Sequence, residues 1–176
     1  MSEFAERLNE QVGDAFAASQ QYLAMGVYYR TELLPRLAAV CYERALDERD
    51  RALAMVRYLV DAGMPTTVPG IPAPESAFAD VVAPLELAVA RQRRMSERAG
   101  ELVLLARAAG DHGSEQFLKR LIGDQSEGLA SLRRLLTVVR RSRHDPFRAE
   151  HFLAGEPECA RFVRPEPVAD AALAVA

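Results

Sequence analysis

Apolar and small residues recur every three or four positions along this chain, which is the spacing of one face of an α-helix. The first such stretch covers residues 1–34 and contains no proline. The second begins at Pro35, a residue that suits the first turn of a helix, and ends at Gly63 and Pro65, which stop one. The pattern therefore predicts two long helices joined by a short turn.

Two further long stretches and one short stretch follow the same spacing. The third predicted helix starts near Asp80, accommodates Pro84 in its first turns and ends before a tight turn at residues 110–113. The fourth carries its apolar stripe to Val139, and a short fifth segment covers residues 146–153. No stretch alternates with a period of two, so we expect an all-α protein.

The connection between the second and third predicted helices is long and rich in proline. Four prolines between residues 65 and 78 exclude a regular helix there, and the segment is long enough to run the length of a bundle. We therefore expect residues 1–154 to form a four-helix bundle with one long crossover and a short fifth helix. Residues 155–176 form a separate Pro/Ala-rich C-terminal tail.

Composition narrows the classes of function. The net charge of −3 argues against a general nucleic-acid binder, which needs a basic excess, and no apolar run reaches the ~18–20 residues of a membrane span. The first residues show no secretory signal. The two cysteines, Cys41 and Cys159, do not make a disulfide framework. We therefore expect a cytoplasmic protein with no nucleic-acid or membrane partner.

Three polar residues interrupt the apolar stripes near the middle of their helices: Glu48, Gln92 and Gln125. In a four-helix bundle they should meet at one level, with Ala15 opposite them on the first helix. Buried polar groups are costly unless they are paired, so one interpretation is a hydrogen-bond network in the core. The other interpretation is a metal site, or the remains of one.

The spacing of these residues argues against an intact metal site. Bundle metal sites take a Glu from each of two helices and a Glu-x-x-His motif from each of the other two. Here Glu48 is followed three positions later by Arg51, a permanent cation that cannot ligate iron, and Gln125 is followed by Gly128. One carboxylate and two amides are a poor set for a hard di-iron centre. Arg51 is instead placed to form an i,i+3 ion pair with Glu48.

Several segments resemble the bacterial non-haem ferritins. Residues 14–24 and 46–52 are similar to the first and second helices of that family, residues 68–71 to its crossover, and residues 110–117 to its last turn and the start of its fourth helix. The resemblance covers about residues 5–155 in order. It implies a ferritin-like four-helix bundle that self-assembles into a hollow shell of about twenty-four subunits, stores iron and binds no haem.

The same resemblance shows which iron ligands are missing. In the family, the first iron site uses a Glu of the first helix and the Glu and His of Glu-x-x-His, and the second uses a Glu of the third helix and a Gln and a Glu of the fourth. The matching positions here are Ala15, Glu48, Arg51, Gln92, Gln125 and Gly128. Only Glu48 and Gln125 keep a ligand, together with Tyr22 beside the centre. The resemblance therefore implies a degenerate ferroxidase centre, as in animal ferritin light chains.

A second group of carboxylates is better preserved. Asp47, Asp124 and Glu127 match carboxylates that lie between the oxidation centre and the inner surface in bacterial ferritins, and Asp50 lies near Asp47 on the same helix. Ferric iron prefers carboxylate oxygen, so an interior acidic face would bind iron weakly and nucleate ferric mineral. The competing interpretation is a solvated helix face without function.

The sequence thus favours an iron-storage shell subunit that lacks an intact di-iron centre, nucleates ferric mineral on interior carboxylates and is not itself a fast ferroxidase. Such a subunit would suit assembly with an intact ferritin subunit. One alternative is an active ferroxidase that oxidises Fe(II) to Fe(III) at a displaced site built from Glu48, Asp47, Asp124 and Glu127. Another is a shell or scaffold that no longer handles iron.

Overall fold

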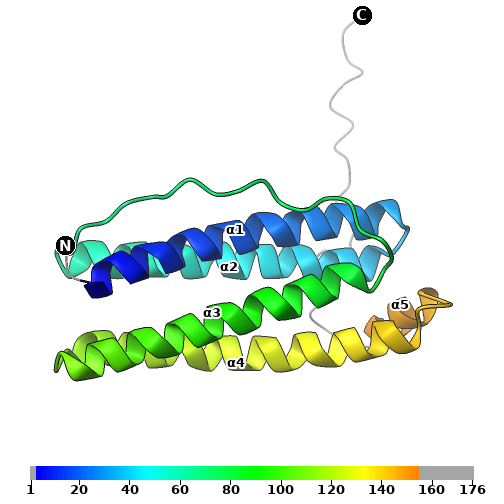
Figure 1. The fold of residues 1–176 in the computed structure, drawn as a ribbon. Helices are drawn as coiled ribbons and strands as arrows, with labels where there is room; N and C mark the ends of the chain where they lie inside the picture. The colour runs from blue at the N-terminus through cyan, green and yellow to red at the C-terminus, as the bar shows by residue number, and fades with distance from the viewer. Residues whose placement is uncertain (1–2, 155–176) are drawn as a thin grey trace, which may run out of the picture.

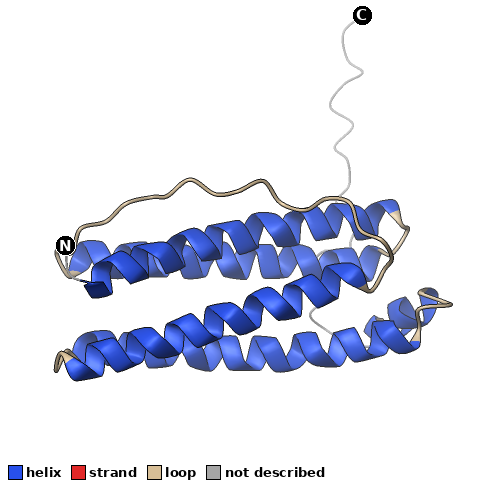
Figure 2. Ribbon diagram, viewed as in Figure 1, coloured by secondary structure: helices blue, strands red, loops and turns tan. Residues whose placement is uncertain are grey.

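The computed structural model describes residues 3–154 and consists of helices joined by loops, with no strand in that range (Figures 1 and 2). The helices are α1 (Glu3–Thr31), α2 (Pro35–Asp61), α3 (Ala83–Ala108), α4 (His112–Arg141) and α5 (Phe147–Leu153). The predicted all-α bundle with one long crossover and a short fifth helix is confirmed. The predicted tail, residues 155–176, lies outside the described residues.

Two helix starts differ from the sequence prediction because side chains cap them. The third helix begins at Ala83 rather than near Asp80, since the Asp80 carboxylate accepts hydrogen bonds from the backbone N–H groups of Val82 and Ala83 at 2.9 and 3.0 Å. The turn predicted at residues 110–113 is shorter than expected. Asp111 caps α4 by accepting from the N–H of Ser114 at 3.0 Å, so the helix already starts at His112.

The four long helices lie side by side, with the crossover of residues 62–82 running along the outside of the bundle (Figure 1). Helices α1 and α2 form one antiparallel pair and α3 and α4 the other, because the turns within each pair are short. None of the helices in the described part of the chain is long and apolar enough to cross a lipid bilayer.

The crossover is held against α1 by polar side chains at three points. The buried Asn9 side chain donates to the carbonyl of Pro65 at 2.8 Å and accepts from the N–H of Thr67 at 2.9 Å. Gln21 binds both backbone groups of Glu75, at 2.8 and 3.0 Å. Further along, the Tyr29 hydroxyl donates to the carbonyl of Val81 at 2.8 Å. These bonds give an irregular, proline-rich segment a fixed path.

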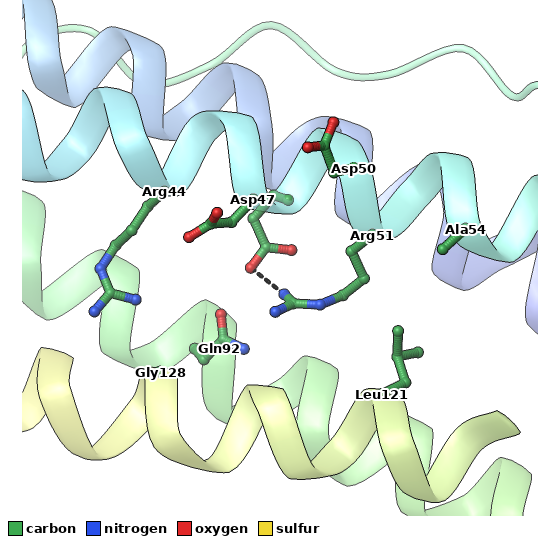
Figure 3. Close-up of a pocket in the computed structure, with 9 residues that line it drawn as sticks. Arg44, Asp47, Asp50, Arg51, Ala54, Gln92, Leu121 and Gly128 are labelled. Atoms are coloured by element: carbon green, nitrogen blue, oxygen red, sulfur yellow. Dashed lines mark hydrogen bonds and ion pairs between the residues drawn. The ribbon is translucent and has the colours of Figure 1, made fainter. Parts of the chain in front are cut away.

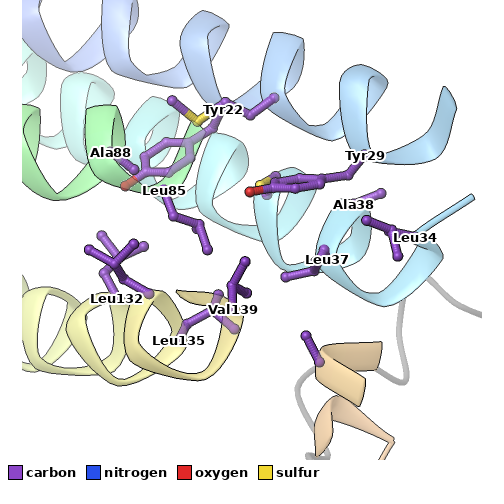
Figure 4. Packing of buried hydrophobic residues seen from close by; sticks show 14 of the residues in the cluster. Tyr22, Tyr29, Leu34, Leu37, Ala38, Leu85, Ala88, Leu132, Leu135 and Val139 are labelled. Carbon is purple, nitrogen blue, oxygen red and sulfur yellow. The ribbon is translucent and has the colours of Figure 1, made fainter. Parts of the chain in front are cut away.

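Apolar side chains from all four long helices fill the interior (Figure 4). At the end near α5, Tyr29 of α1, Leu37 of α2, Leu85 of α3 and Val139 of α4 are completely buried. The α1–α2 contact is close enough to require a glycine, because a Cβ at Gly26 would lie 2.3 Å from the Tyr42 ring.

Helix α5 is tied to the start of α2 by a buried carboxylate. Glu150 accepts from the backbone N–H of Arg36 at 2.9 and 3.0 Å and from that of Leu37 at 2.8 Å. These N–H groups belong to the first turn of α2, where backbone N–H groups have no acceptor inside their own helix. The positive end of the helix dipole at this turn also attracts negative charge. Glu150 thus closes one end of the bundle.

Candidate functional site

The predicted polar level of the bundle lies beside a cavity of about 450 Å³ between α2, α3 and α4 (Figure 3). Most of its wall comes from one face of α2, and one residue of α3 and two residues of α4 complete it. The lining side chains are Arg44, Asp47, Glu48, Asp50, Arg51, Ala54, Gln92 and Leu121, together with Gly128. The structure therefore brings Glu48, Arg51, Gln92 and Gly128 together, as the sequence predicts.

Glu48 and Arg51 form the ion pair that their spacing on one helix allows. Arg51 Nη1 lies 2.5 Å from Glu48 Oε1, and the two side chains are only 13% and 5% exposed. Burial raises the pKa of the Glu48 carboxyl above its usual value, while the nearby Arg51 guanidinium acts in the opposite direction. The guanidinium reaches only one carboxylate oxygen, and Oε2 of Glu48 is buried without a hydrogen-bond partner.

The expected hydrogen-bond network between Glu48, Gln92 and Gln125 does not form. Both amides are buried, with exposures of 3% and 1%, but no hydrogen bond joins either of them to Glu48. Among the described residues, Gln125 Oε1 has no hydrogen-bond partner. The reason is geometric, since Glu48 and Gln92 line the same open cavity from different helices instead of meeting in a closed core. The fourth predicted position, Ala15, is fully buried within apolar packing.

Arg44 is a member of the site that the sequence analysis did not identify. It lies four residues before Glu48, so it projects from the same face of α2 and extends towards Gly128 and Gln92 (Figure 3). A Cβ at Gly128 would lie 3.5 Å from Arg44 Nη1. The i, i+4 spacing from Glu48 was the available signal, but a charged residue beside a helix stripe usually faces solvent.

Tyr22 of α1 is also close to the centre, as the sequence suggests. Its side chain is buried, and burial strongly raises the pKa of its phenol. The nearby charges have smaller effects, since Arg44 lowers this pKa and Glu48 raises it. The neighbouring thiol of Cys41 is likewise buried and has a pKa raised to about 12 by burial. Both groups are therefore neutral at physiological pH.

The acidic residues predicted to bind iron lie at the rim of the cavity or outside it. Asp47, Asp50 and Glu127 are exposed, and Asp50 pairs with Arg49 at 3.2 Å. The side chain of Asp124 lies outside the described residues. Among the side chains that the structure describes, no three His, Cys, Asp or Glu residues lie close enough together to hold a metal ion.

The described side chains around the cavity carry both acidic and basic groups. A di-iron centre needs several carboxylates, and the cavity offers one buried carboxylate that already pairs with a cation. Two arginine side chains, each permanently charged, line the same space. Among the described residues, the buried carboxylate of Glu48 thus shares the cavity with two guanidinium groups, and the carboxylates of Asp47 and Asp50 are exposed.

The similarity of this chain to known proteins extends over most of the bundle. A sequence model of the ferritin-like domain matches residues 5–142. Ferritin BfrB of Mycobacterium tuberculosis is 33% identical over 159 residues, which cover 90% of this chain and 88% of that protein. A bacterial non-heme ferritin of Staphylococcus epidermidis is 28% identical over 125 residues, or 71% of this chain and 75% of that one. The solved open pore ferritin of Archaeoglobus fulgidus superposes with a TM-score of 0.82 at 23% identity, covering 94% of this chain and 99% of that chain.

Proposed function

Because this chain belongs to the ferritin-like family, we propose that it is an iron-storage shell subunit without an intact di-iron ferroxidase centre. In this proposal the subunit does not oxidise Fe(II) rapidly. It offers exposed carboxylates on which ferric mineral grows, and oxidation occurs slowly at the mineral surface or on another subunit. Iron is the cargo of such a protein and not a resident cofactor, and no haem is required.

One observation carries the proposal. Arg51 stands where a Glu-x-x-His motif would place its imidazole, and its guanidinium is bound to the one buried carboxylate of the centre at 2.5 Å. An arginine cannot lose its proton at physiological pH, so it cannot become a ligand. Binding of a ferrous ion by Glu48 would have to break this pair in a largely buried place, which is costly.

The nucleating role is assigned to Asp47, Asp50, Asp124 and Glu127. The described members of this set are exposed, so their oxygens are accessible to hydrated iron without desolvation of a buried charge. Hard ferric iron prefers such oxygen ligands. Weak, distributed binding suits growth of a mineral better than storage of a single ion.

Self-assembly into a hollow shell, of about twenty-four subunits, completes the proposal. Its support is the match in length and fold to ferritins, since the chain spans 88% of the Mycobacterium tuberculosis protein and 99% of the Archaeoglobus fulgidus chain. A subunit without an oxidation centre would benefit from a shell shared with an intact ferritin subunit. We expect such a shell to work in the cytoplasm.

The test is oxidation of Fe(II) by the purified assembly. Fe(II) is added anaerobically, O2 is pulsed in, and ferric absorbance is followed from milliseconds to hours. We expect only slow growth that exceeds the rate in buffer. A fast phase of about two irons per subunit would refute the proposal, because a di-iron centre binds that number. Growth no faster than in buffer would identify a scaffold that has abandoned iron.

A matched pair of variants tests the nucleating carboxylates. The triple variant D47A/D50A/E127A removes three described members of the set, and E86A/E97A/E101A removes three exposed carboxylates of α3 with the same change in net charge. Mineral growth should slow only in the first variant. Equal rates in both variants would remove the carboxylates from the proposal and leave the degenerate centre unaffected.

A further inference from the structure

We propose that Arg44 is a specificity-determining residue of the degenerate centre: together with Arg51 it keeps divalent cations out, so that restoring the missing ligands alone does not restore metal binding. This inference rests on the proposed function, because it explains how the centre excludes iron. The positive charge of Arg44 would oppose metal binding in addition to the loss of ligands. Arg44 occupies no position at which a ligand was expected, which distinguishes it from Arg51.

The two arginines flank the buried carboxylate from opposite sides. Arg44 lies four residues before Glu48 and Arg51 three residues after it, so all three side chains share one face of α2 (Figure 3). Both guanidiniums line the cavity, and both influence the ionisation of Glu48. One buried carboxylate thus faces two permanent positive charges.

Arg44 differs from Arg51 in its contacts with the described side chains. Its Nε is buried and donates to no described oxygen, and none of the ion pairs between described residues involves it. The two arginines that follow it on α2 are engaged, since Arg49 pairs with Asp50 and Arg51 pairs with Glu48. The charge of Arg44 therefore remains directed into the cavity, where an incoming cation would meet it.

The contact with α4 shows why a restored ligand would fail. The last ligand of a Glu-x-x-His type motif on α4 falls at Gly128, and a Cβ at this position would lie 3.5 Å from Arg44 Nη1 with no other neighbour within 4 Å. That distance is ordinary contact, so a side chain fits. A carboxylate introduced at this position would then reach the guanidinium and form an ion pair with it instead of binding a metal.

Metal binding by re-engineered shells tests this inference. The starting variant, A15E/R51H/Q92E/G128E, restores all four lost ligand types. It is compared with the same variant carrying R44Q, and with a matched control carrying R49Q, which removes an exposed arginine five residues further along α2. Zinc binding to the assembled protein is measured by titration calorimetry, since Zn(II) has no redox chemistry that would complicate the signal.

We expect about two zinc ions per subunit only when R44Q is present, with the second ion bound at least about tenfold more tightly than in the starting variant. The R49Q control should behave as the starting variant does. Equal zinc binding with and without R44Q, whether at both sites or at neither, would overturn the inference. The proposed function is tested separately, by Fe(II) oxidation in the unmodified protein, so the two can fail independently.

A double-mutant cycle tests the same contact without rebuilding the centre, in case the fourfold variant does not fold. The variants are G128E, R44Q and R44Q/G128E, and the measured quantity is the melting temperature of the assembled protein. If the ion pair forms in G128E, the double variant R44Q/G128E should melt at least about 3 °C below the temperature expected from the sum of the two single effects. Additive effects would show that no ion pair forms between the two positions and would overturn the inference.

Discussion

Replacement of Arg51 by methionine is the most direct test of the charge balance in the centre. The variant R51M keeps the bulk of the side chain but leaves Glu48 as a buried carboxylate without its partner. The two side chains are 13% and 5% exposed, so solvent screening is weak. Two unit charges about 4 Å apart interact by about 4 kcal/mol at an effective dielectric constant of about 20. Removing one partner of a buried pair costs about 3–5 kcal/mol by experiment on other proteins.

The loss should depend on pH in a defined direction. Burial already raises the pKa of Glu48, and R51M removes the strongest influence that lowers it. A carboxyl with a folded-state pKa above its unfolded value binds its proton more readily in the folded state. Its stabilising effect is therefore complete below the unfolded pKa and is lost as pH rises through the folded pKa. The deficit of R51M relative to the native protein should be larger at pH 8 than at pH 5.

Thermal denaturation at the two pH values measures this effect. For a domain of this size, about 1 kcal/mol shifts the melting temperature by roughly 2–4 °C, so R51M should melt roughly 10 °C below the native protein at pH 8. The deficit should at least halve at pH 5, and E48Q/R51M should recover most of the loss because the buried carboxylate that lacked its partner is no longer charged. The control R49M breaks an exposed pair and should change the melting temperature by less than about 2 °C. A deficit that is equal at both pH values would refute the reasoning.

Two further substitutions test the architecture around the site. E150Q removes the charge that accepts three hydrogen bonds at the start of α2, so we expect a loss of about 1–3 kcal/mol in the free energy of unfolding, measured by chemical denaturation; an unchanged value would mean that α5 does not anchor the bundle. G26A brings a methyl group to 2.3 Å from the ring of Tyr42 and should cost about 1–3 kcal/mol. G100A meets nothing within 4 Å and should instead stabilise its helix by up to about 1 kcal/mol, and a similar loss in both would contradict the packing argument.

The helices and their order follow from local sequence. The spacing of apolar residues, the stop at Gly63 and the run of prolines after it act within one element, so they predict the four long helices and the crossover without tertiary information. The exact start of α3 does not follow in this way. Asp80 reads as a helical residue by position, and only the hydrogen bonds of its carboxylate show that it caps the helix from outside.

Several residues that line the cavity could also be identified from the sequence. Glu48 and Arg51 lie three residues apart on one helix, so the spacing allows their ion pair, whereas only the structure shows that Arg51 forms it instead of pointing to solvent. Gln92 and Gln125 stand out as polar residues on apolar stripes, and the resemblance to ferritins gives the family positions that they and Gly128 match. What it did not supply is whether these residues satisfy one another, because hydrogen bonds between helices depend on distances that no spacing along the chain encodes.

Only the tertiary structure shows which side chains meet around the cavity and which of them form hydrogen bonds. The sequence by itself determined that the chain forms a helical bundle, that its buried level carries a single carboxylate, and that arginine stands where an imidazole is needed. The approach of α2 to α4 then decided that Arg44 faces Gly128 and that Glu48 and Gln92 share a cavity without a bond. Local spacing fixes which residues share a helix face, whereas packing between helices fixes which faces meet and at what distance.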